Sequence, residues 1–360
     1  MSNFSWRRLS SLMTVSALTL STLVACSGVP TADTAADTAT DTTAESADAD
    51  ATTEGGVCAP EITEIEFGIL STESAENLKP QWEPLLADMT EAVGRPVKGF
   101  YATDYAAVIE GMGAGKVQVA WYGGKSYVEA AERSDAEAFA QTVALDGSKG
   151  YYAYLITNKE NPIVANIDLE KGNGDKYIVE NAGNLTFAFN DPNSTSGFLV
   201  PTYYVFSQQG VNADKIFKEL VFAGSHEATA LAVAENQVDV ATNNSENLAS
   251  LKESAPDALE KIQIIWTSPE IPSDPIAYRK DLPECLKTSV KDFFVGYDNK
   301  EIMEGLQWSG LDPAKDEDWN TIRELEIANS MLEVQNDKNL SDADKQKQLD
   351  ELNKALEAFK

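Results

Sequence analysis

Residues 189–198 read Phe-Asn-Asp-Pro-Asn-Ser-Thr-Ser-Gly-Phe and connect a short apolar stretch to a helical one. The preceding residues 185–189 are typical of a β-strand, and Asp191-Pro192-Asn193 is typical of a turn. From Phe198 onward apolar residues recur at helical spacing, so Ser194 is expected near the N-cap of a helix. The stretch therefore predicts a strand, a turn and a helix.

Three hydroxyl residues, Ser194, Thr195 and Ser196, follow this turn. The first N–H groups of a helix have no partner inside the helix and lie at the positive end of its dipole. Together with the hydroxyls, they predict a site for a phosphoryl-type anion. The alternative is an ordinary serine N-cap in a loop. Pro201, which lacks an N–H, indicates a kink or a late helix start.

The composition limits the number of domains and the kinds of partner that the protein can have. The chain has 360 residues, of which 43% are hydrophobic, and a formal net charge of -30. This length suits two domains with their own cores. The negative charge argues against nucleic acid or anionic lipid as a partner, because either polyanion would be repelled. Any anion site must therefore be a local arrangement inside a cleft.

The N-terminus is predicted to be a bacterial lipoprotein signal peptide over residues 1–25. Arg7 and Arg8 precede an apolar stretch that is too short and polar for a comfortable membrane span. It ends in Leu23-Val24-Ala25-Cys26, a lipoprotein box in which Cys26 carries the lipid. The alternative is a plain secretory signal with a chance cysteine. Either way, the chain is expected in the periplasm or cell envelope, with the lipid as its only contact with the membrane.

Residues 26–59 are predicted to form an acidic, disordered tether. Residues 27–56 contain no aromatic residue, no Lys and no Arg, so they cannot bury enough apolar surface to fold. The remaining cysteines, Cys58 and Cys285, would lie in an oxidising compartment. We expect one disulfide between them, the alternative being two unpaired thiols.

The body of the chain alternates strands and helices in two runs. Expected strands cover residues 65–70, 97–101, 117–121, 185–189, 220–223, 238–241 and 262–266. The pattern predicts two α/β lobes, each a mainly parallel sheet covered by helices. Residues 60–157 would form the first part of lobe 1, residues 158–268 lobe 2, and residues 269–360 a return to lobe 1 plus C-terminal helices.

Two segments are expected to cross between these lobes, Tyr151 to Thr157 and Ile264 to Asp274. Two exported lobes joined by two strands describe a clamshell receptor. Ligands of such sheets bind beyond the carboxyl ends of the strands, where Ser71, Thr72, Tyr105, Tyr122 and Gly123 fall. Each of these residues has a helix cap or packing role as its alternative.

Six motifs occur in order along the chain. They are Ser71-Thr72-Glu73-Ser74, Asp104-Tyr105-Ala106, Ala120-Trp121-Tyr122-Gly123, residues 190–201, Val238-Asp239-Val240-Ala241-Thr242-Asn243-Asn244 and Ile271-Pro272-Ser273-Asp274-Pro275. Together they resemble the phosphonate-binding protein of bacterial ABC importers, from about Ile62 to the C-terminus. The resemblance implies a type II-like periplasmic clamshell that delivers alkylphosphonates, notably 2-aminoethylphosphonate, to a membrane permease.

The resemblance also implies the ligand contacts. The phosphonate oxygens would be bound by Tyr105, Tyr151, Ser194, Thr195, Ser196 and His226, and the ammonium group by Glu246 and Asp274. A helix N-terminus with hydroxyls suits an oxyanion, and paired carboxylates suit a cation, so the cleft would be complementary to a zwitterion. Without the resemblance, His226 is interpreted as a structural imidazole and the two carboxylates as solvated charges.

Two alternative functions remain at this point. A receptor for phosphite, methylphosphonate or phosphate is disfavoured, because Glu246 and Asp274 would repel a ligand that has no cation. A phosphoester hydrolase would need Ser194, His226 and Glu246 as nucleophile, base and orienting group. No strained Gly-x-Ser-x-Gly turn surrounds Ser194, and one histidine offers no metal cluster. We therefore expect no enzyme activity, cofactor or metal.

The C-terminal residues 319–332 and 342–359 carry apolar residues at helical spacing among charged ones. Leu349, Leu352, Leu356 and Phe359 would form one stripe. It is expected either to pack a helix across the back of lobe 1 or to pair two copies of the chain as a homodimer.

Overall fold

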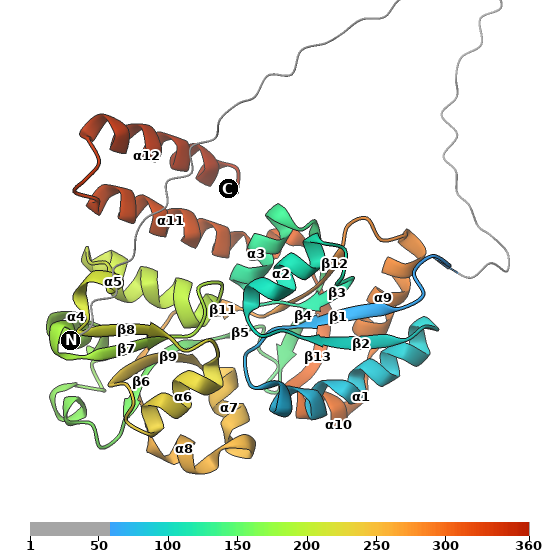
Figure 1. The fold of residues 1–360 in the computed structure, drawn as a ribbon, viewed down its shortest axis with the longest axis horizontal. Helices are drawn as coiled ribbons and strands as arrows, with labels where there is room; N and C mark the ends of the chain where they lie inside the picture. The colour runs from blue at the N-terminus through green and yellow to red at the C-terminus, as the bar shows by residue number, and fades with distance from the viewer. Residues whose placement is uncertain (1–57, 360) are drawn as a thin grey trace, which may run out of the picture. The chain divides into compact units, whose positions relative to one another are not determined.

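The computed structural model describes residues 58–359, which form two helix-covered sheets side by side (Figure 1). The predicted signal peptide, the predicted lipidation site Cys26 and nearly all of the predicted tether lie outside the described residues. Among the described helices, none combines the length and apolar character that a membrane crossing requires.

The first lobe is built on a six-stranded sheet. Its strands, in spatial order, are β13 (Trp308–Pro313), β4 (Ala136–Ala144), β12 (Pro275–Arg279), β3 (Val119–Trp121), β1 (Ile65–Ile69) and β2 (Val97–Tyr101). One face packs against α1 (Ala75–Val93), α9 (Glu284–Gly296) and α10 (Lys300–Gly305). The other face packs against α2 (Tyr105–Gly113) and α3 (Gly124–Arg133). The sheet is therefore buried on both faces.

The second lobe is built on a five-stranded sheet. Its order is β10 (Ile262–Thr267), β6 (Ala153–Asn158), β9 (Val240–Asn244), β7 (Thr186–Phe189) and β8 (Glu219–Phe222). α4 (Gly174–Asn181) and α5 (Ala213–Ile216) belong to the core on one face. α6 (His226–Ala234), α7 (Ser245–Ser254) and α8 (Pro256–Lys261) contribute to the core on the other. The two-lobed α/β clamshell is thus confirmed.

Both sheets are mixed, which corrects the expectation of mainly parallel sheets. β1 pairs in parallel with β2 and β3, and β7 pairs in parallel with β8 and β9. The remaining pairs within these two sheets are antiparallel. The parallel strands end at the cleft, whereas β6 and β12 enter their sheets from the crossings and so begin at the cleft. β6 and β12 therefore run antiparallel to their neighbouring strands.

The crossings between the lobes are shorter than the sequence predicts. β5 (Gly150–Tyr151) and β11 (Ile271–Pro272) form a separate two-stranded antiparallel ladder. β6 pairs with β9 and β10 in the second sheet, so residues 153–157 belong to lobe 2 and not to lobe 1. Tyr151 and Asp274 therefore lie at the hinge itself.

The segment before β1 is joined to α9 by a disulfide between Cys58 and Cys285, whose Cα atoms are 6.0 Å apart. The partners are 227 residues apart in sequence, and the loop that the bond closes contains lobe 2 and every strand of the six-stranded sheet except β13.

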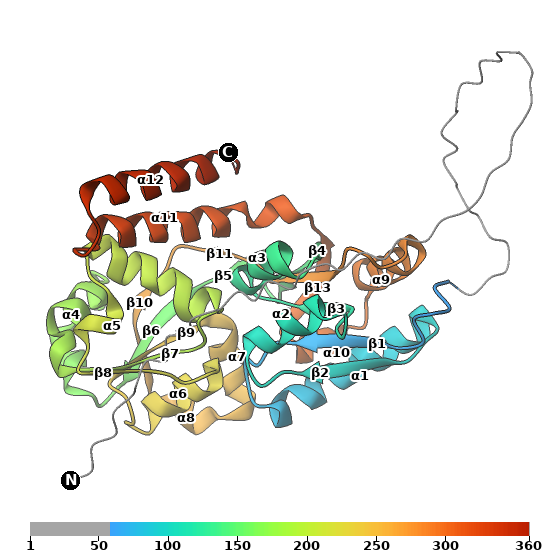
Figure 2. The same cartoon turned by 45° about the horizontal axis from the view of Figure 1, so that its top comes forward.

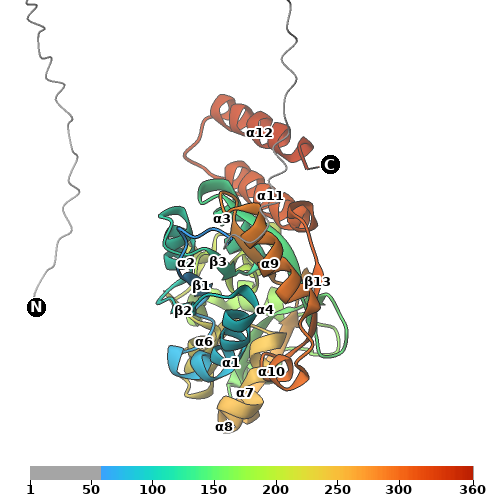
Figure 3. The same cartoon turned by 90° about the vertical axis from the view of Figure 1, so that its right-hand side faces the viewer.

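The C-terminal helices α11 (Asn320–Asn336) and α12 (Asp342–Glu357) lie on the outside of the molecule (Figures 2 and 3). α11 is not confined to lobe 1. It forms a salt bridge from Glu326 to Lys125 of α3 at 3.2 Å, and Asn329 accepts a hydrogen bond from Ser207 of lobe 2 at 2.7 Å. α12 packs along α11 and has no buried residue. That these helices pair two copies of the chain stays a prediction.

Candidate ligand-binding site

A cavity of about 80 Å³ lies between the lobes. Every ligand-contact residue predicted from the sequence lines it: Tyr105, Tyr151, Ser194, Thr195, Ser196, His226, Glu246 and Asp274. The structure thus brings together residues from both lobes and the hinge. By volume, the cavity has room for roughly five to eight water-sized groups, so it suits one small ligand.

Ser194 is the N-cap of the helical segment that follows β7. Its backbone is extended, with φ −80° and ψ 136°, and its Oγ accepts the N–H of Gly197 at 2.9 Å. The same Oγ also accepts a hydrogen bond from Asn190 Nδ2 at 3.2 Å. Ser194 can cap the helix and also contact a ligand in the cavity, because a hydroxyl can accept two hydrogen bonds and still donate one.

The helix after Ser194 begins as a wide π-helical turn. η3 (Thr195–Leu199) and η4 (Thr202–Phe206) flank Pro201, and the N–H of Leu199 bonds to the carbonyl of Ser194 at 3.1 Å. The missing N–H of Pro201 explains why regular α-helical pairing is interrupted here. Such local π-helical turns are frequent at functional sites.

Gly197 holds this turn against the strand. A Cβ at this position would lie 2.4 Å from Asn190 Cβ and 2.8 Å from Ser194 Oγ. Only glycine allows the helix start to approach the end of β7 so closely.

The other hydroxyls in the cavity also accept hydrogen bonds from the protein. Thr195 Oγ1 accepts the backbone N–H of Lys125, in the other lobe, at 2.9 Å. Ser196 Oγ accepts from Asn244 Nδ2 at 3.1 Å, and Tyr105 Oη accepts from Asn190 Nδ2 at 3.3 Å. A hydroxyl that accepts from the protein still carries a proton to donate. The lining therefore offers several O–H donors to an oxyanion.

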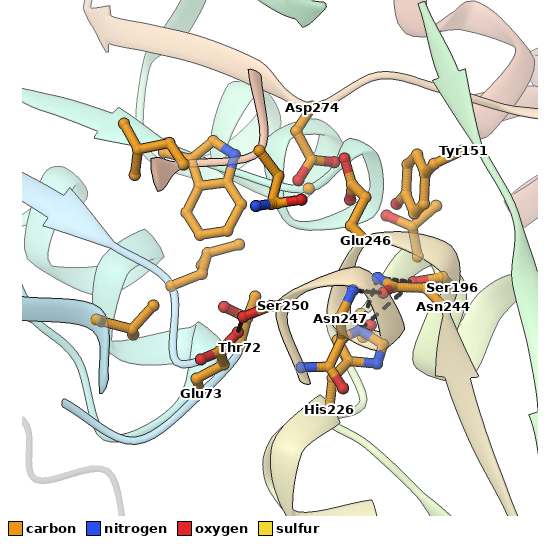
Figure 4. A pocket seen from close by; sticks show the side chains of 18 of the residues that line it. Thr72, Glu73, Tyr151, Ser196, His226, Asn244, Glu246, Asn247, Ser250 and Asp274 are labelled. Atoms are coloured by element: carbon orange, nitrogen blue, oxygen red, sulfur yellow. Dashed lines mark hydrogen bonds between the residues drawn. The ribbon is translucent and has the colours of Figure 1, made fainter. Parts of the chain in front are cut away.

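His226 is the first residue of α6 and is 2% exposed. Its Nε2 lies 3.4 Å from both Ser196 Oγ and Asn244 Nδ2 (Figure 4). Burial lowers the pKa of His226 to about 3, so the ring is neutral at neutral pH. A neutral imidazole can serve as a hydrogen-bond partner without adding a buried charge.

The contacts of His226 do not form a hydrolytic triad. The ring meets Ser196, whereas Ser194 serves as the cap, and Nδ1 has no hydrogen-bond partner among the described residues. A triad requires a carboxylate on the second ring nitrogen and the nucleophile on the first. The described residues also include no cluster of His, Cys, Asp and Glu that suits a metal.

Glu246 and Asp274 place two carboxyl groups in the cavity from opposite directions. Glu246 lies in the first turn of α7, and Asp274 follows β11 at the hinge. Burial raises the pKa of Glu246 to about 7. Burial, and then the charge of Glu246, raise the pKa of Asp274 well above its ordinary value. The pair therefore favours a bound proton or a bound cation.

Several lining residues were not predicted as ligand contacts from the sequence. Glu73, Asn244, Asn247 and Ser250 contribute polar atoms, and Trp82, Trp121 and Trp308 contribute an aromatic wall. Glu73, Trp121 and Asn244 lie within the sequence motifs, so their positions at or just after the ends of strands were a usable signal. Trp308 comes from β13, far along the chain, and nothing in its local sequence points to the cleft.

The chain matches a family model described as ABC transporter, phosphonate, periplasmic substrate-binding protein, over residues 67–319. It is 47% identical over 309 residues to the phosphonates-binding periplasmic protein of Escherichia coli K12, covering 82% of this chain and 88% of that protein. The chain therefore belongs to the family of periplasmic phosphonate-binding proteins of ABC transporters.

Solved structures agree on the fold. The binding protein component of an ABC phosphonate transporter from Pseudomonas aeruginosa superposes with a TM-score of 0.78 and 42% identity, covering 82% of this chain and 96% of that one. PhnD1 of Prochlorococcus marinus, in complex with methylphosphonate, has a TM-score of 0.65 and 22% identity, covering 73% and 97%. Because only 22% of the residues are identical, the similarity to PhnD1 supports a shared fold and nothing about the ligand of this chain.

Proposed function

We propose that this substrate-binding protein captures aminoalkylphosphonates, with 2-aminoethylphosphonate as the preferred ligand, and delivers them to the permease of its importer. The observation that carries the proposal is the presence of two opposite kinds of polar group in one small cavity. Hydroxyl donors gather at the start of η3, and two carboxyl groups lie near the hinge. A zwitterion with its charges a few carbons apart satisfies both.

The phosphonate end would be bound by O–H and N–H donors. Ser194, Thr195, Ser196 and Tyr105 each accept a hydrogen bond from the protein, which leaves their hydroxyl protons free to point at ligand oxygens. Hydrogen bonds to an ionised acceptor are stronger than neutral ones. His226 and Tyr151 complete the set we assign to the phosphonate group.

The amine end would be bound by Glu246 and Asp274. In the absence of a cation, burial raises the pKa of both carboxyl groups, and repulsion by the charge of Glu246 raises that of Asp274 further. An ammonium group between them removes the repulsion and neutralises the buried charge. Asp274 Oδ1, which has no hydrogen-bond partner among the described residues, is available to accept from it.

The same carboxyl groups disfavour the alternative ligands. Phosphite, phosphate and methylphosphonate carry no cation, so each would leave Glu246 and Asp274 unneutralised beside an anion. Calorimetric titration of the purified protein with 2-aminoethylphosphonate, methylphosphonate, phosphite and phosphate tests the proposal. We expect the aminophosphonate to bind at least tenfold more tightly than the others, since a charge-assisted hydrogen bond contributes about 1.5–3 kcal/mol. Tighter binding of phosphate or phosphite would refute it.

We also propose that Cys26 carries the lipid that tethers the protein to the membrane. The basis is the Leu23-Val24-Ala25-Cys26 box and the acidic, aromatic-free stretch after it. A tether of this composition lets the binding lobes reach the permease from a fixed anchor.

A further inference from the structure

We propose that Glu73 and Asn247 form a second polar subsite in the ligand cavity, which binds a hydroxyl group on the carbon chain of the phosphonate. The inference rests on the proposed function, because it concerns which aminophosphonates the same cavity prefers. Glu73 is contributed by lobe 1 and Asn247 by lobe 2, so the subsite is assembled where the two lobes meet.

Both side chains are buried and incompletely paired. Glu73 is 7% exposed and Asn247 is 5% exposed. Glu73 Oε2 and both amide atoms of Asn247, Oδ1 and Nδ2, have no hydrogen-bond partner among the described residues. Buried polar atoms without partners are uncommon and costly. Because these atoms belong to residues that line the cavity, a cavity occupant is the group best placed to satisfy them.

The carboxylate of Glu73 is held in a defined position. Its other oxygen, Oε1, accepts a hydrogen bond from Ser250 Oγ of lobe 2 at 2.5 Å. Asn247 is anchored through its backbone, whose N–H bonds to Asn244 Oδ1 at 2.7 Å. Figure 4 shows Glu73, Thr72 and Ser250 grouped together, apart from Asp274, Glu246 and Tyr151. Glu73 is thus separate from the carboxyl pair that we assign to the amine, and Asn247 lies on the side of Asn244 and His226.

The unpaired atoms select the chemistry of the occupant. A hydroxyl can donate to Glu73 Oε2 and accept from Asn247 Nδ2 at the same time. An ammonium group could donate to Glu73 Oε2 and Asn247 Oδ1 but would leave Nδ2 unpaired, and we assign the amine to Glu246 and Asp274 instead; a methyl group would leave all three atoms unpaired. On an aminoethyl chain, the hydroxyl must lie on the carbon bonded to phosphorus, since a hydroxyl on the amine-bearing carbon would form an unstable hemiaminal.

Two matched ligand pairs test the subsite by calorimetric titration of the purified protein. One pair is 2-aminoethylphosphonate with and without a 1-hydroxyl group, and the other is ethylphosphonate with and without it. The variants are Glu73→Gln, which keeps an oxygen for Ser250, and Asn247→Ala. Glu76→Gln is the control, because Glu76 is exposed in the first turn of α1, three residues after Glu73, and does not line the cavity.

We expect the wild-type protein and Glu76→Gln to bind each hydroxylated ligand more tightly than its parent. Glu73→Gln and Asn247→Ala should reduce this preference about tenfold. No preference for the hydroxyl in the wild-type protein, or equal losses for both members of a pair, would overturn the subsite and leave these atoms to bind only water or to support closure. The ethylphosphonate pair contains no amine, so it tests the subsite even if the amine assignment fails, and the two proposals can fail separately.

Discussion

Glu227 of lobe 2 accepts the backbone N–H of Ser74 of lobe 1 at 2.6 Å. The second oxygen of this carboxylate accepts from Asn77 Nδ2 at 2.7 Å, so it caps the start of α1 from across the cleft. Two further helices of lobe 1 begin in the same way: Tyr105 N–H bonds to Asp191 Oδ2 at 3.4 Å, and Lys125 N–H bonds to Thr195 Oγ1 at 2.9 Å. Lobe closure therefore satisfies helix N–H groups that have no partner inside their own helices.

Replacing Glu227 with Ala should weaken all ligands by a similar factor. The carboxylate stabilises the closed arrangement without lining the cavity, and the loss of a helix cap costs about 1 kcal/mol. We expect about a fivefold loss of affinity for both 2-aminoethylphosphonate and methylphosphonate, measured by titration. A loss confined to one ligand would show instead that Glu227 acts on the ligand itself.

Thr195→Val and Ser194→Ala should separate binding from folding. Among residues 58–359, the hydrogen bond that Thr195 Oγ1 forms crosses between the lobes, so its loss is expected to reduce phosphonate affinity at least tenfold with little change in the melting temperature. Ser194 also caps its own helix, so Ser194→Ala should in addition lower the free energy of unfolding by about 1 kcal/mol. Unchanged affinity in Thr195→Val, with the melting temperature preserved, would argue against the hydroxyl donors as the oxyanion site.

The stability of the ligand-free protein should depend on pH through Glu246. Because burial raises the pKa of Glu246 to about 7, the folded state binds a proton more tightly than the unfolded state does. Proton binding by Glu246 therefore raises the free energy of unfolding. This contribution is complete below the ordinary carboxyl pKa and is lost as pH rises through about 7, which lowers the free energy of unfolding by about 1–3 kcal/mol. Urea unfolding at pH 5 and pH 8 measures it.

Glu246→Gln is the control for this pH effect. The variant should lose less stability than the wild-type protein between pH 5 and pH 8, because the titrating group is gone. An identical decline in both proteins would assign the effect to other buried carboxyl groups, such as Asp274, Glu73 and Asp191, whose pKa values burial also raises.

Cys26→Ala should release the protein from membranes. A lipid anchor contributes roughly 0.8 kcal/mol per buried CH₂ group, and no helix among the described residues can replace it by crossing the bilayer. Fractionation of cells that express the wild-type and variant proteins measures the release. Membrane association that survives the substitution would show that the N-terminus is retained by another means.

Local chemistry accounts for what could be predicted from the sequence. The turn at Asp191-Pro192-Asn193 and the cap at Ser194 are set by residues within a few positions of each other, so the strand, turn and helix were predictable. The clustering of Tyr105, Ser194 and His226 was also predictable, because each follows a strand whose carboxyl end meets the cleft. Tyr151 and Asp274 were assigned to the site only through the family resemblance.

The remaining features depend on contacts that local sequence does not encode. The strand direction of β12 follows from its entry at the hinge, and the aromatic wall needs Trp308, brought in by β13. The bonding of Glu73 to Ser250 joins residues 177 positions apart. The position of α11 across both lobes likewise depends on Lys125 and Ser207, which belong to different lobes.

The most direct test of the proposed ligand recognition compares two ligands in the variant Glu246→Gln/Asp274→Asn. Methylphosphonate lacks an amine, so it should bind the variant as well as it binds the wild-type protein, or better. 2-Aminoethylphosphonate should lose most of its affinity, because a desolvated charge pairing is removed and such losses amount to several kcal/mol. Calorimetry should therefore show a fall of at least a hundredfold in the affinity ratio of the two ligands. Parallel weakening of both ligands would contradict this recognition and assign the carboxyl pair to the fold or the hinge.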